Sequence, residues 1–181
     1  MLHLKNITAG NPKTAEQYQM TKRHSIVWLF SEDGKNWYEE QKNFASDTIK
    51  VAYNERGRVV WIGKDVTGIE PTNVSIIELP DITTNRRITA PGYWFYRNDE
   101  FVFDYKLKAE DERDALLKQV SIMTSEWEKD LLLGLISDED REKLKAYRIY
   151  AKSLQALDFS TIADKTSYNA IEWPVSPEAS S

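Results

Sequence analysis

Two hydropathy patterns divide the chain near residue 105. Before that point, short apolar and β-branched runs alternate with turn signals rich in Gly, Asn or Asp, which is typical of β-strands. These runs lie at 26–30, 48–53, 58–62 and 73–79. From about Ala109, apolar residues recur every three to four positions among charged ones, which predicts an α-helix over 109–133. The pattern therefore favours an α+β protein that begins with a small antiparallel β-rich domain.

The most specific strand signal is a hairpin in which 93–96 and 101–105 flank Asn98-Asp99. A two-residue loop at this position sets the register of the two strands. The facing aromatic pairs are then Trp94 with Phe103 and Tyr96 with Phe101. Each such cross-strand pair stabilises a hairpin by about 0.2–1 kcal/mol. Phe95 belongs to the opposite face, so we expect one face to pack inward and the other to be covered as well.

The second half of the chain is predicted to be an antiparallel helical hairpin at 106–158. Ser137, with Asp140 three residues later, resembles a capping box and begins the second helix. The short link around Gly134 favours antiparallel neighbours. The seam between the helices is expected to contain Leu116, Val120, Met123, Trp127, Leu144, Tyr147 and Leu154. The predicted domains are thus a β-rich domain at 1–105, the helical hairpin at 106–158, and an extended tail at 159–181 pinned by Trp173.

Composition and charge narrow the classes of function. The 181 residues carry a net charge of −5 and contain no cysteine. A negative chain with no run of Lys and Arg longer than two is a poor ligand for nucleic acid or an anionic membrane. Without cysteine there is no disulfide, thiolate nucleophile or Cys-based zinc site. No window approaches the roughly 18 apolar residues of a membrane span, and no signal peptide is recognised, so a cytoplasmic protein is expected.

No residue pattern predicts catalysis. His3 and His24 are the only histidines, and no nucleophile-elbow pattern accompanies them. The segment 63–68 lacks the glycine spacing of a phosphate loop. The acidic run 138–140 lacks calcium-loop spacing, and acidic residues are ordinary in the first turn of a helix. A glycosidase-type carboxylate pair is compatible with the sequence but supported by no motif. We therefore expect no catalytic residue, no metal and no cofactor.

Aromatic residues are concentrated in the first domain, with 15 of the 21 in residues 1–105. Most are expected to fill the core, but a thin β domain cannot bury all of them. At least one exposed aromatic patch is therefore expected, of the kind enriched at protein interfaces. The predicted partner-binding residues are those of the hairpin, namely Trp94, Tyr96, Phe101, Phe103 and Tyr105.

Several segments, taken in order, resemble the tail fibre assembly proteins of tailed bacteriophages and prophages. They are 3–7, 10–14, 28–40, 80–87, Leu144-Lys145-Ala146-Tyr147-Arg148 and Ile171-Glu172-Trp173-Pro174. The resemblance covers nearly the whole chain. Three features depart from the family pattern and bear on partner choice. The hairpin carries Arg97-Asn98-Asp99 where many relatives have a Trp-Asn-Gly turn, and an apolar run, Leu131–Leu133, precedes Gly134. The segment from Phe159 to Tyr168 is longer than in shorter relatives.

The resemblance implies a chaperone that binds the distal, C-terminal part of a trimeric phage tail fibre and promotes its folding and trimerisation. It implies work in the cytoplasm of the bacterial host, and in some members retention at the fibre tip in the virion. Two further readings stay open. The first is a virion-associated module that binds host-surface glycans, since aromatic rings also stack on sugars. The second, which the sequence supports less, is an enzyme. Self-association through the helical hairpin is open as well.

Overall fold

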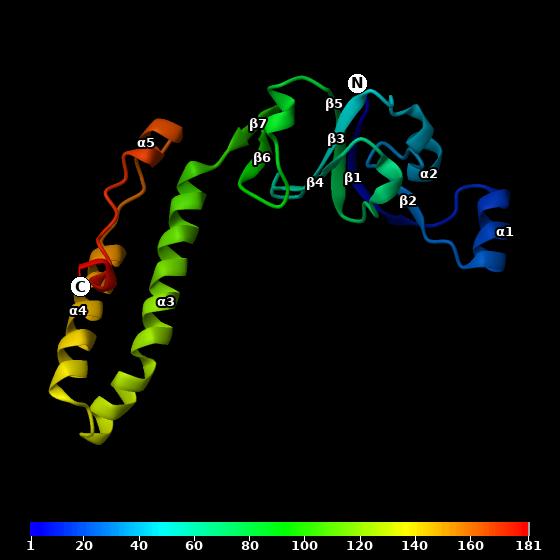
Figure 1. Cartoon of the computed structure of the whole chain (residues 1–181). Coiled ribbons are helices and arrows are strands. Elements are labelled where there is room, and N and C mark those ends of the chain that lie inside the picture. Colours follow the sequence, from blue (N-terminus) through cyan, green and yellow to red (C-terminus); the bar gives the residue numbers. More distant parts are fainter. Residues whose placement is uncertain (181) are drawn as a thin grey trace. The chain divides into compact units, whose positions relative to one another are not determined.

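The computed structural model describes residues 1–180 and divides the chain into two compact units, one from Met1 to Phe103 and one from Asp104 onward (Figure 1). The N-terminal unit contains a five-stranded antiparallel sheet in the order β2-β1-β5-β3-β4 and a separate two-stranded sheet, β6-β7. The strands are β1 (His3–Gly10), β2 (Trp28–Phe30), β3 (Thr48–Asn54), β4 (Val59–Gly63), β5 (Val74–Pro80), β6 (Trp94–Arg97) and β7 (Glu100–Phe103). The predicted α+β class is confirmed.

The predicted strand runs correspond to β2, β3, β4 and β5, whereas β1 was not predicted from the sequence. Two helices of this unit were also not predicted, α1 (Ala15–His24) and the single turn α2 (Trp37–Glu40). In β1 only Leu4 and Ile7 are buried, and a register irregularity separates them. A strand whose two buried residues are three apart does not show the alternation by which strands are recognised.

Alternation along the central strands divides the apolar side chains between two faces of the sheet. On one face, Ala52 and Ile76 join Leu4 and the fully buried Trp37 of α2 in one core cluster. The other face carries a second cluster, Ile49, Val51, Val59 and Ile88. The β6-β7 hairpin packs against this second cluster through Trp94 and Phe101. The sheet is therefore covered on both faces.

A close backbone contact fixes the hairpin to the turn between β3 and β4. The amide of Tyr96 donates to the carbonyl oxygen of Gly57 over 2.7 Å. Gly57 has a φ of +80°, and a Cβ at this position would collide with the backbone oxygen of Tyr96. Glycine is required here both for the left-handed conformation and for the close approach.

The second unit is a helical hairpin of α3 (Tyr105–Leu133) and α4 (Asp138–Gln155) (Figure 1). Asp104 caps α3, its carboxylate accepting from the amide of Leu107 over 2.9 Å, so the helix begins four residues earlier than predicted. The predicted cap of α4 is confirmed, because Ser137 Oγ accepts from the amide of Asp140 over 3.1 Å. Gly134, with a φ of +70°, ends α3.

The segment expected to be an extended tail is extended only in part. It contains a short helix, α5 (Lys165–Asn169), capped by Asp164 through a reciprocal capping box with Ser167. A 3₁₀ helix follows at Pro177–Ser180. Trp173 packs against the core of the helical hairpin, as expected, and its ring lies 5.8 Å from that of Phe159. The tail therefore folds back onto the two long helices.

Candidate partner-binding surfaces

The aromatic pairs predicted for the β6-β7 hairpin are present. The register pairs Trp94 with Phe103 and Tyr96 with Phe101, and the ring centroids of these pairs are 5.5 Å and 5.0 Å apart. The connecting residues Asn98 and Asp99 both have positive φ, at 51° and 62°. This is the conformation of a two-residue type I′ loop, which matches the twist of the flanking strands.

These rings are half-buried, and most of them serve packing inside the N-terminal unit. Trp94 and Phe101 contact the core cluster around Val51 and Val59. Tyr96 stacks on Tyr53 at 4.6 Å, while Phe95, on the opposite face, is buried beneath the guanidinium of Arg97 at 4.3 Å. The hairpin therefore presents half-buried rings rather than a widely exposed aromatic patch. The widely exposed aromatic rings of the described chain are instead Tyr18 and Tyr38.

Polar groups of the same cluster are held neutral near pH 7. His3 Nε2 lies 2.6 Å from the hydroxyl of Tyr53, and the hydroxyl of Tyr96 donates to Asp99 over 3.0 Å. Burial lowers the pKa of His3, and the positive charge of Lys5 adds to the effect. Burial, followed by the hydrogen bond to Asp99, raises the pKa of Tyr96 to about 12. The cluster thus presents uncharged rings rather than an ionic site.

Tyr105, the last of the predicted partner-binding residues, is not part of the β-hairpin but the first residue of α3. Its ring lies 5.6 Å from that of Tyr168 on α5. The hydroxyl of Tyr168 donates to Glu112 over 2.6 Å, and Lys108 Nζ lies 4.3 Å above the same ring. Tyr105 and these neighbours fasten the returning tail to the start of α3.

The residues predicted for the helix seam differ in burial. Val120, Leu144, Tyr147 and Leu154 are buried, and Tyr150, which was not predicted, is buried with them. Leu116 and Trp127 are half-buried against this cluster, and the rings of Trp127 and Tyr147 are 6.0 Å apart. Met123 is 40% exposed. The seam is therefore closed toward the end of α4 and open near Met123 and Trp127.

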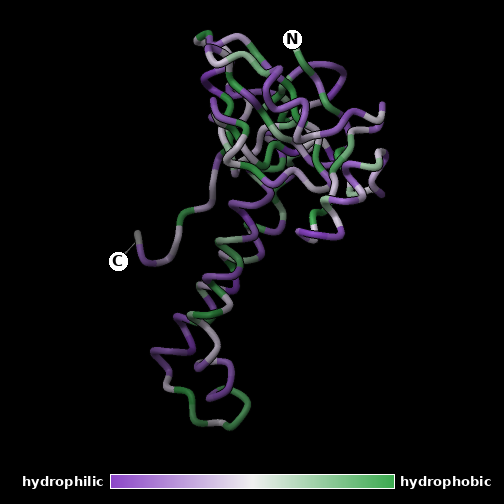
Figure 2. Tube along the Cα trace, turned by 90° about the vertical axis from the view of Figure 1, so that its right-hand side faces the viewer, coloured by the Kyte–Doolittle hydropathy of each residue, from purple (hydrophilic) through white to green (hydrophobic). Residues whose placement is uncertain are grey.

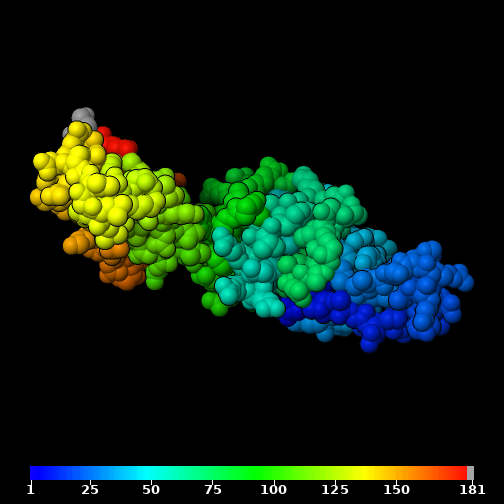
Figure 3. All heavy atoms as spheres, turned by 90° about the horizontal axis from the view of Figure 1, so that it is seen from below, coloured from blue at the N-terminus to red at the C-terminus, as the bar shows by residue number. Residues whose placement is uncertain are grey.

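The turn between α3 and α4 carries an uncovered apolar surface, which we name the leucine tip and define as Leu131, Leu132, Leu133 and Leu135. Their exposed fractions are 46%, 87%, 71% and 71%. Figure 2 shows the hydrophobic stretch at this turn, and Figure 3 shows the turn facing the viewer. Consecutive leucines cannot all face α4, because neighbouring positions on a helix point in different directions.

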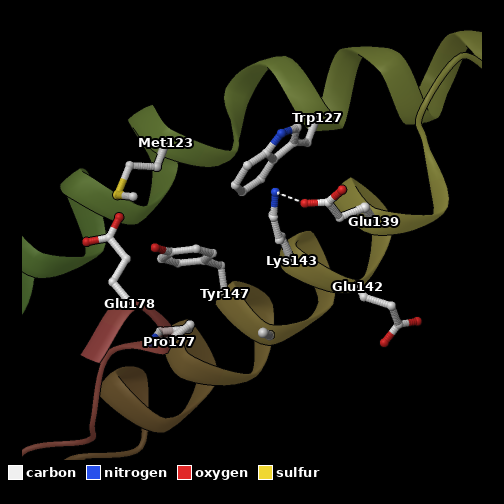
Figure 4. Close-up of a pocket in the computed structure, with 9 residues that line it drawn as sticks. Met123, Trp127, Glu139, Glu142, Lys143, Tyr147, Pro177 and Glu178 are labelled. Carbon is white, nitrogen blue, oxygen red and sulfur yellow. Dashed lines mark ion pairs between the residues drawn. The ribbon is translucent and has the colours of Figure 1, made fainter. Parts of the chain in front are cut away.

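A pocket of about 730 Å³ lies beside the open part of the seam; we name it the seam pocket. Its lining residues are Met123, Trp127, Glu139, Glu142, Lys143, Ala146, Tyr147, Pro177 and Glu178. In Figure 4 the rings of Trp127 and Tyr147 and the thioether of Met123 point into the space between the helices. Lys143 pairs with Glu139 at 2.6 Å. No sequence motif marked Pro177 and Glu178, which reach the pocket only because the tail folds back.

Neither a metal centre nor a membrane-spanning helix occurs in the part of the chain that the structure describes. Residues 1–180 contain no group of three or more His, Asp or Glu side chains that could hold a metal ion. None of the helices there combines the length and apolar character that crossing a bilayer requires. The candidate surfaces are thus the leucine tip, the seam pocket and the half-buried hairpin rings.

Comparison with known proteins identifies the chain. Residues 39–178 match the model of the family described as Caudovirales tail fibre assembly protein, lambda gpK. The chain belongs to this family. The match includes β3 to β7 and the helical hairpin, which carries the leucine tip and the seam pocket. The elements β1, α1 and β2 precede the matched residues.

Individual tail fibre assembly proteins are similar over most of their length. Tail fiber assembly protein U′ of Escherichia phage Mu is 46% identical over 168 residues, which cover 90% of this chain and 95% of the relative. Tail fiber assembly protein U of the same phage is 39% identical over 184 residues, covering 98% and 100%. A probable tail fiber assembly protein of Escherichia phage P2 is also 39% identical, with the same coverage.

Proposed function

We propose that this protein is an assembly chaperone that binds the distal, C-terminal part of a trimeric phage tail fibre and promotes its folding and trimerisation. Relatives that match nearly the whole chain are named for tail fibre assembly. The structural observation that carries the proposal is the leucine tip, where four apolar side chains at one helical turn have no cover. Exposed apolar patches of this kind mark interaction sites on soluble proteins.

The proposed task has a physical rationale. Intertwined β-rich trimers depend on non-local contacts and fold slowly, and their unpaired edges and apolar patches aggregate in the meantime. A rigid helical hairpin that presents leucines covers such a patch until the three fibre chains reach the correct register. This holding activity needs neither a catalytic residue nor a cofactor.

The N-terminal unit offers less free surface for the same task. β2, at one edge of its sheet, is only three residues long, and Arg58, just before β4 at the other edge, makes a β-bridge with Phe95. The half-buried rings of Trp94, Tyr96, Phe101 and Phe103 form a second proposed fibre contact, smaller than the leucine tip. Tyr105, at the start of α3, is a separate proposed fibre contact that belongs to the helical unit.

The proposal also covers where the chaperone acts and whether the free chaperone associates with itself. The chaperone acts in the cytoplasm of the bacterial host during virion assembly, and it stays on the fibre tip if the leucine tip is still covered by the finished trimer. Self-association of the free protein would cover the same leucines until a fibre displaces it. Neither membrane insertion nor a nucleic acid belongs to the proposed activity.

Co-expression with the partner fibre tests this function directly. The fibre that we expect to be encoded beside this protein is produced with and without it. Size-exclusion chromatography with light scattering measures the mass of the soluble fibre. We expect soluble trimer only in the presence of the chaperone, with co-elution if the chaperone stays bound. A fibre that is equally soluble and trimeric alone, with no complex, contradicts the proposal.

A glycan-binding virion module is the alternative, and Tyr18 and Tyr38 are the exposed rings that could stack on a sugar. Binding of the isolated protein to host-surface glycans, together with no effect on fibre solubility, would favour it. Substituting each tyrosine by alanine would then abolish glycan binding.

A further inference from the structure

The seam pocket combines apolar walls with an acidic rim. Met123 and Trp127 from α3, Ala146 and Tyr147 from α4, and Pro177 from the tail form its walls (Figure 4). Its volume of about 730 Å³ is within the range of pockets that bind ligands or peptide side chains. The half-buried ring of Trp127 leaves part of its surface open to the pocket, whereas Tyr147, which is 5% exposed, forms part of the wall. An open ring surface favours flat or elongated side chains over small polar ones.

Charges around the seam pocket are predominantly negative. Three glutamates line it, Glu139, Glu142 and Glu178, against one lysine, and Glu142 lies 3.7 Å from a second lysine, Lys145. The lining lysine, Lys143, is already paired with Glu139 at 2.6 Å and lies 3.6 Å from Asp140, so it does not offer a free positive charge. Glu178 lines the pocket, and burial, followed by a hydrogen bond to this glutamate, raises the pKa of Tyr147. The rim therefore complements a positively charged partner.

The pocket is also continuous with the proposed fibre contact. Trp127 and Leu131 are four residues apart on α3, and residues at this spacing lie on one face of a helix. A chain held at the leucine tip can therefore continue along α3 into the pocket.

We infer that the seam pocket binds a short segment of the partner fibre in which an apolar or aromatic side chain stands next to lysine or arginine. The apolar side chain fills the space between Met123, Ala146 and Pro177. The aliphatic stem of the basic residue lies along the half-buried ring of Trp127, where its charge gains a cation–π interaction. The cationic head meets the glutamates of the rim. This inference rests on the proposed function, since the fibre supplies the segment.

Synthetic peptides test the pocket without the fibre. The probe is acetyl-Gly-Lys-Leu-Trp-Lys-Arg-Gly-amide, and the controls replace its basic residues by glutamate or its Leu-Trp pair by Ser-Ser. Calorimetry measures affinity for the full chain, and NMR follows the indole N–H resonance of Trp127, assigned with Trp127→Phe. We expect both control peptides to bind at least about tenfold more weakly, and added salt to weaken the basic peptide.

Variants of the protein locate the binding. Ala146→Phe fills the pocket, and we expect it to lower the affinity for the basic peptide about tenfold or more. Replacing Glu139, Glu142 and Glu178 together by glutamine is expected to lower it about 3–10-fold and to reduce its salt dependence. Glu126→Gln is the matched control, because this exposed glutamate of α3 does not line the pocket. Circular dichroism verifies that each variant is folded.

Each outcome supports or overturns the inference independently of the proposed function. Unchanged binding in Ala146→Phe, or equal binding of the acidic peptide, overturns it even if co-expression still yields soluble fibre. A pocket occupied by a second copy would appear as a dimer that Ala146→Phe disrupts, without peptide binding, and this also overturns it. If the basic peptide binds as expected but the fibre needs no chaperone, the pocket is confirmed and the proposed function fails.

Discussion

The N-terminal unit packs most of its aromatic side chains inside, with Tyr18 and Tyr38 as exceptions, whereas the helical unit leaves aliphatic side chains exposed. Trp94 and Phe101 of the β-hairpin contact the second core cluster, and Tyr96 stacks on Tyr53. In the helical unit, Leu132, with 87% of its surface exposed, has no such cover. The aromatic-rich unit therefore contains two hydrophobic core clusters, and the run of leucines lies in the unit that contains one. That run is where consecutive apolar side chains are exposed.

The two units also differ in charge. Residues 1–103 contain 13 basic and 13 acidic residues, while residues 104–181 contain 11 basic and 16 acidic residues. The whole net charge of −5 thus belongs to the helical unit. The negative charge of the helical unit attracts basic partners, whereas the sheet unit has no net charge with which to attract them.

The largest expected effect compares one tryptophan from each unit. Trp37 is 1% exposed and lies beside Phe44 in the first core cluster, so Trp37→Ala is expected to destabilise the N-terminal unit by about 3–5 kcal/mol. Trp127 is only half-buried beside the seam pocket, and Trp127→Ala is expected to cost about 1.5–3 kcal/mol. Urea unfolding followed by circular dichroism measures both free energies of unfolding.

An equal loss of unfolding free energy in the two variants would contradict the difference in burial between Trp37 and Trp127. If Trp127→Ala cost as much as Trp37→Ala, the seam would be closed in solution and the pocket beside it would not be open to a partner. Because each unit has its own core, each variant should shift the unfolding of its own unit more than that of the other.

A smaller effect is expected from the hairpin rings. Trp94→Ala removes a half-buried ring from the cluster around Val51 and Val59, and should cost about 1.5–3 kcal/mol. Because the same ring belongs to the second proposed fibre contact, the folded variant is also expected to co-elute with less fibre than the wild type. Circular dichroism measures the loss of stability, and co-elution with the fibre measures binding. Unchanged binding by the folded variant would show that the ring serves packing alone.

The smallest effect is a pH dependence confined to the N-terminal unit, which contains both histidines. Burial, with Lys5, lowers the pKa of His3 from its ordinary value of 6.5, against the weaker opposing charges of Asp99 and Glu32. The unfolded chain therefore binds the proton more readily than the folded one. The contribution of His3 to stability is complete above pH 6.5 and is lost as the pH falls from there toward its lower folded pKa.

Thermal unfolding between about pH 7.5 and about pH 5.5 checks this sign. The Tm of the N-terminal unit should fall over this interval in the wild type and fall less in His3→Gln. Since His24 is present in both proteins, its contribution cancels in the difference. Identical pH profiles would show that the protonation of His3 is not coupled to folding.

Local patterns predicted those elements whose signal lies within a few residues. The register of the β6-β7 hairpin followed from its two-residue loop, and the start of α4 followed from Ser137 and Asp140. The helix α1 carries a comparable capping signal at its start. Thr14 and Gln17 have the spacing of a capping box, and the amide of Gln17 does donate to Thr14 Oγ1 over 3.1 Å.

Contacts between distant segments were not predictable in this way. The stacking of Tyr96 on Tyr53 depends on where the hairpin docks on the sheet, which no local period encodes. The seam pocket depends on the return of Pro177 and Glu178 to α4. The run Leu131–Leu133 was recognised in the sequence, but its exposure depends on how the two helices meet at Gly134. The sequence therefore predicted where an apolar run lies, but not that its side chains are exposed.

The most direct test of the account is co-expression of the fibre with a chaperone that lacks the leucine tip. The tip variant carries Leu132→Ser, Leu133→Ser and Leu135→Ser. The matched control carries Val27→Ser, Val60→Ser and Ile82→Ser, three exposed apolar residues of the N-terminal unit. Exposed positions of this kind change stability by no more than about 0.5 kcal/mol each, so both variants should fold.

Size-exclusion chromatography with light scattering then gives the yield of soluble fibre trimer. The account predicts that the control variant supports as much trimer as the wild type and that the tip variant supports little or none, although circular dichroism shows it folded. A folded tip variant that yields as much soluble trimer as the wild type would contradict the claim that the fibre is held by the leucine tip.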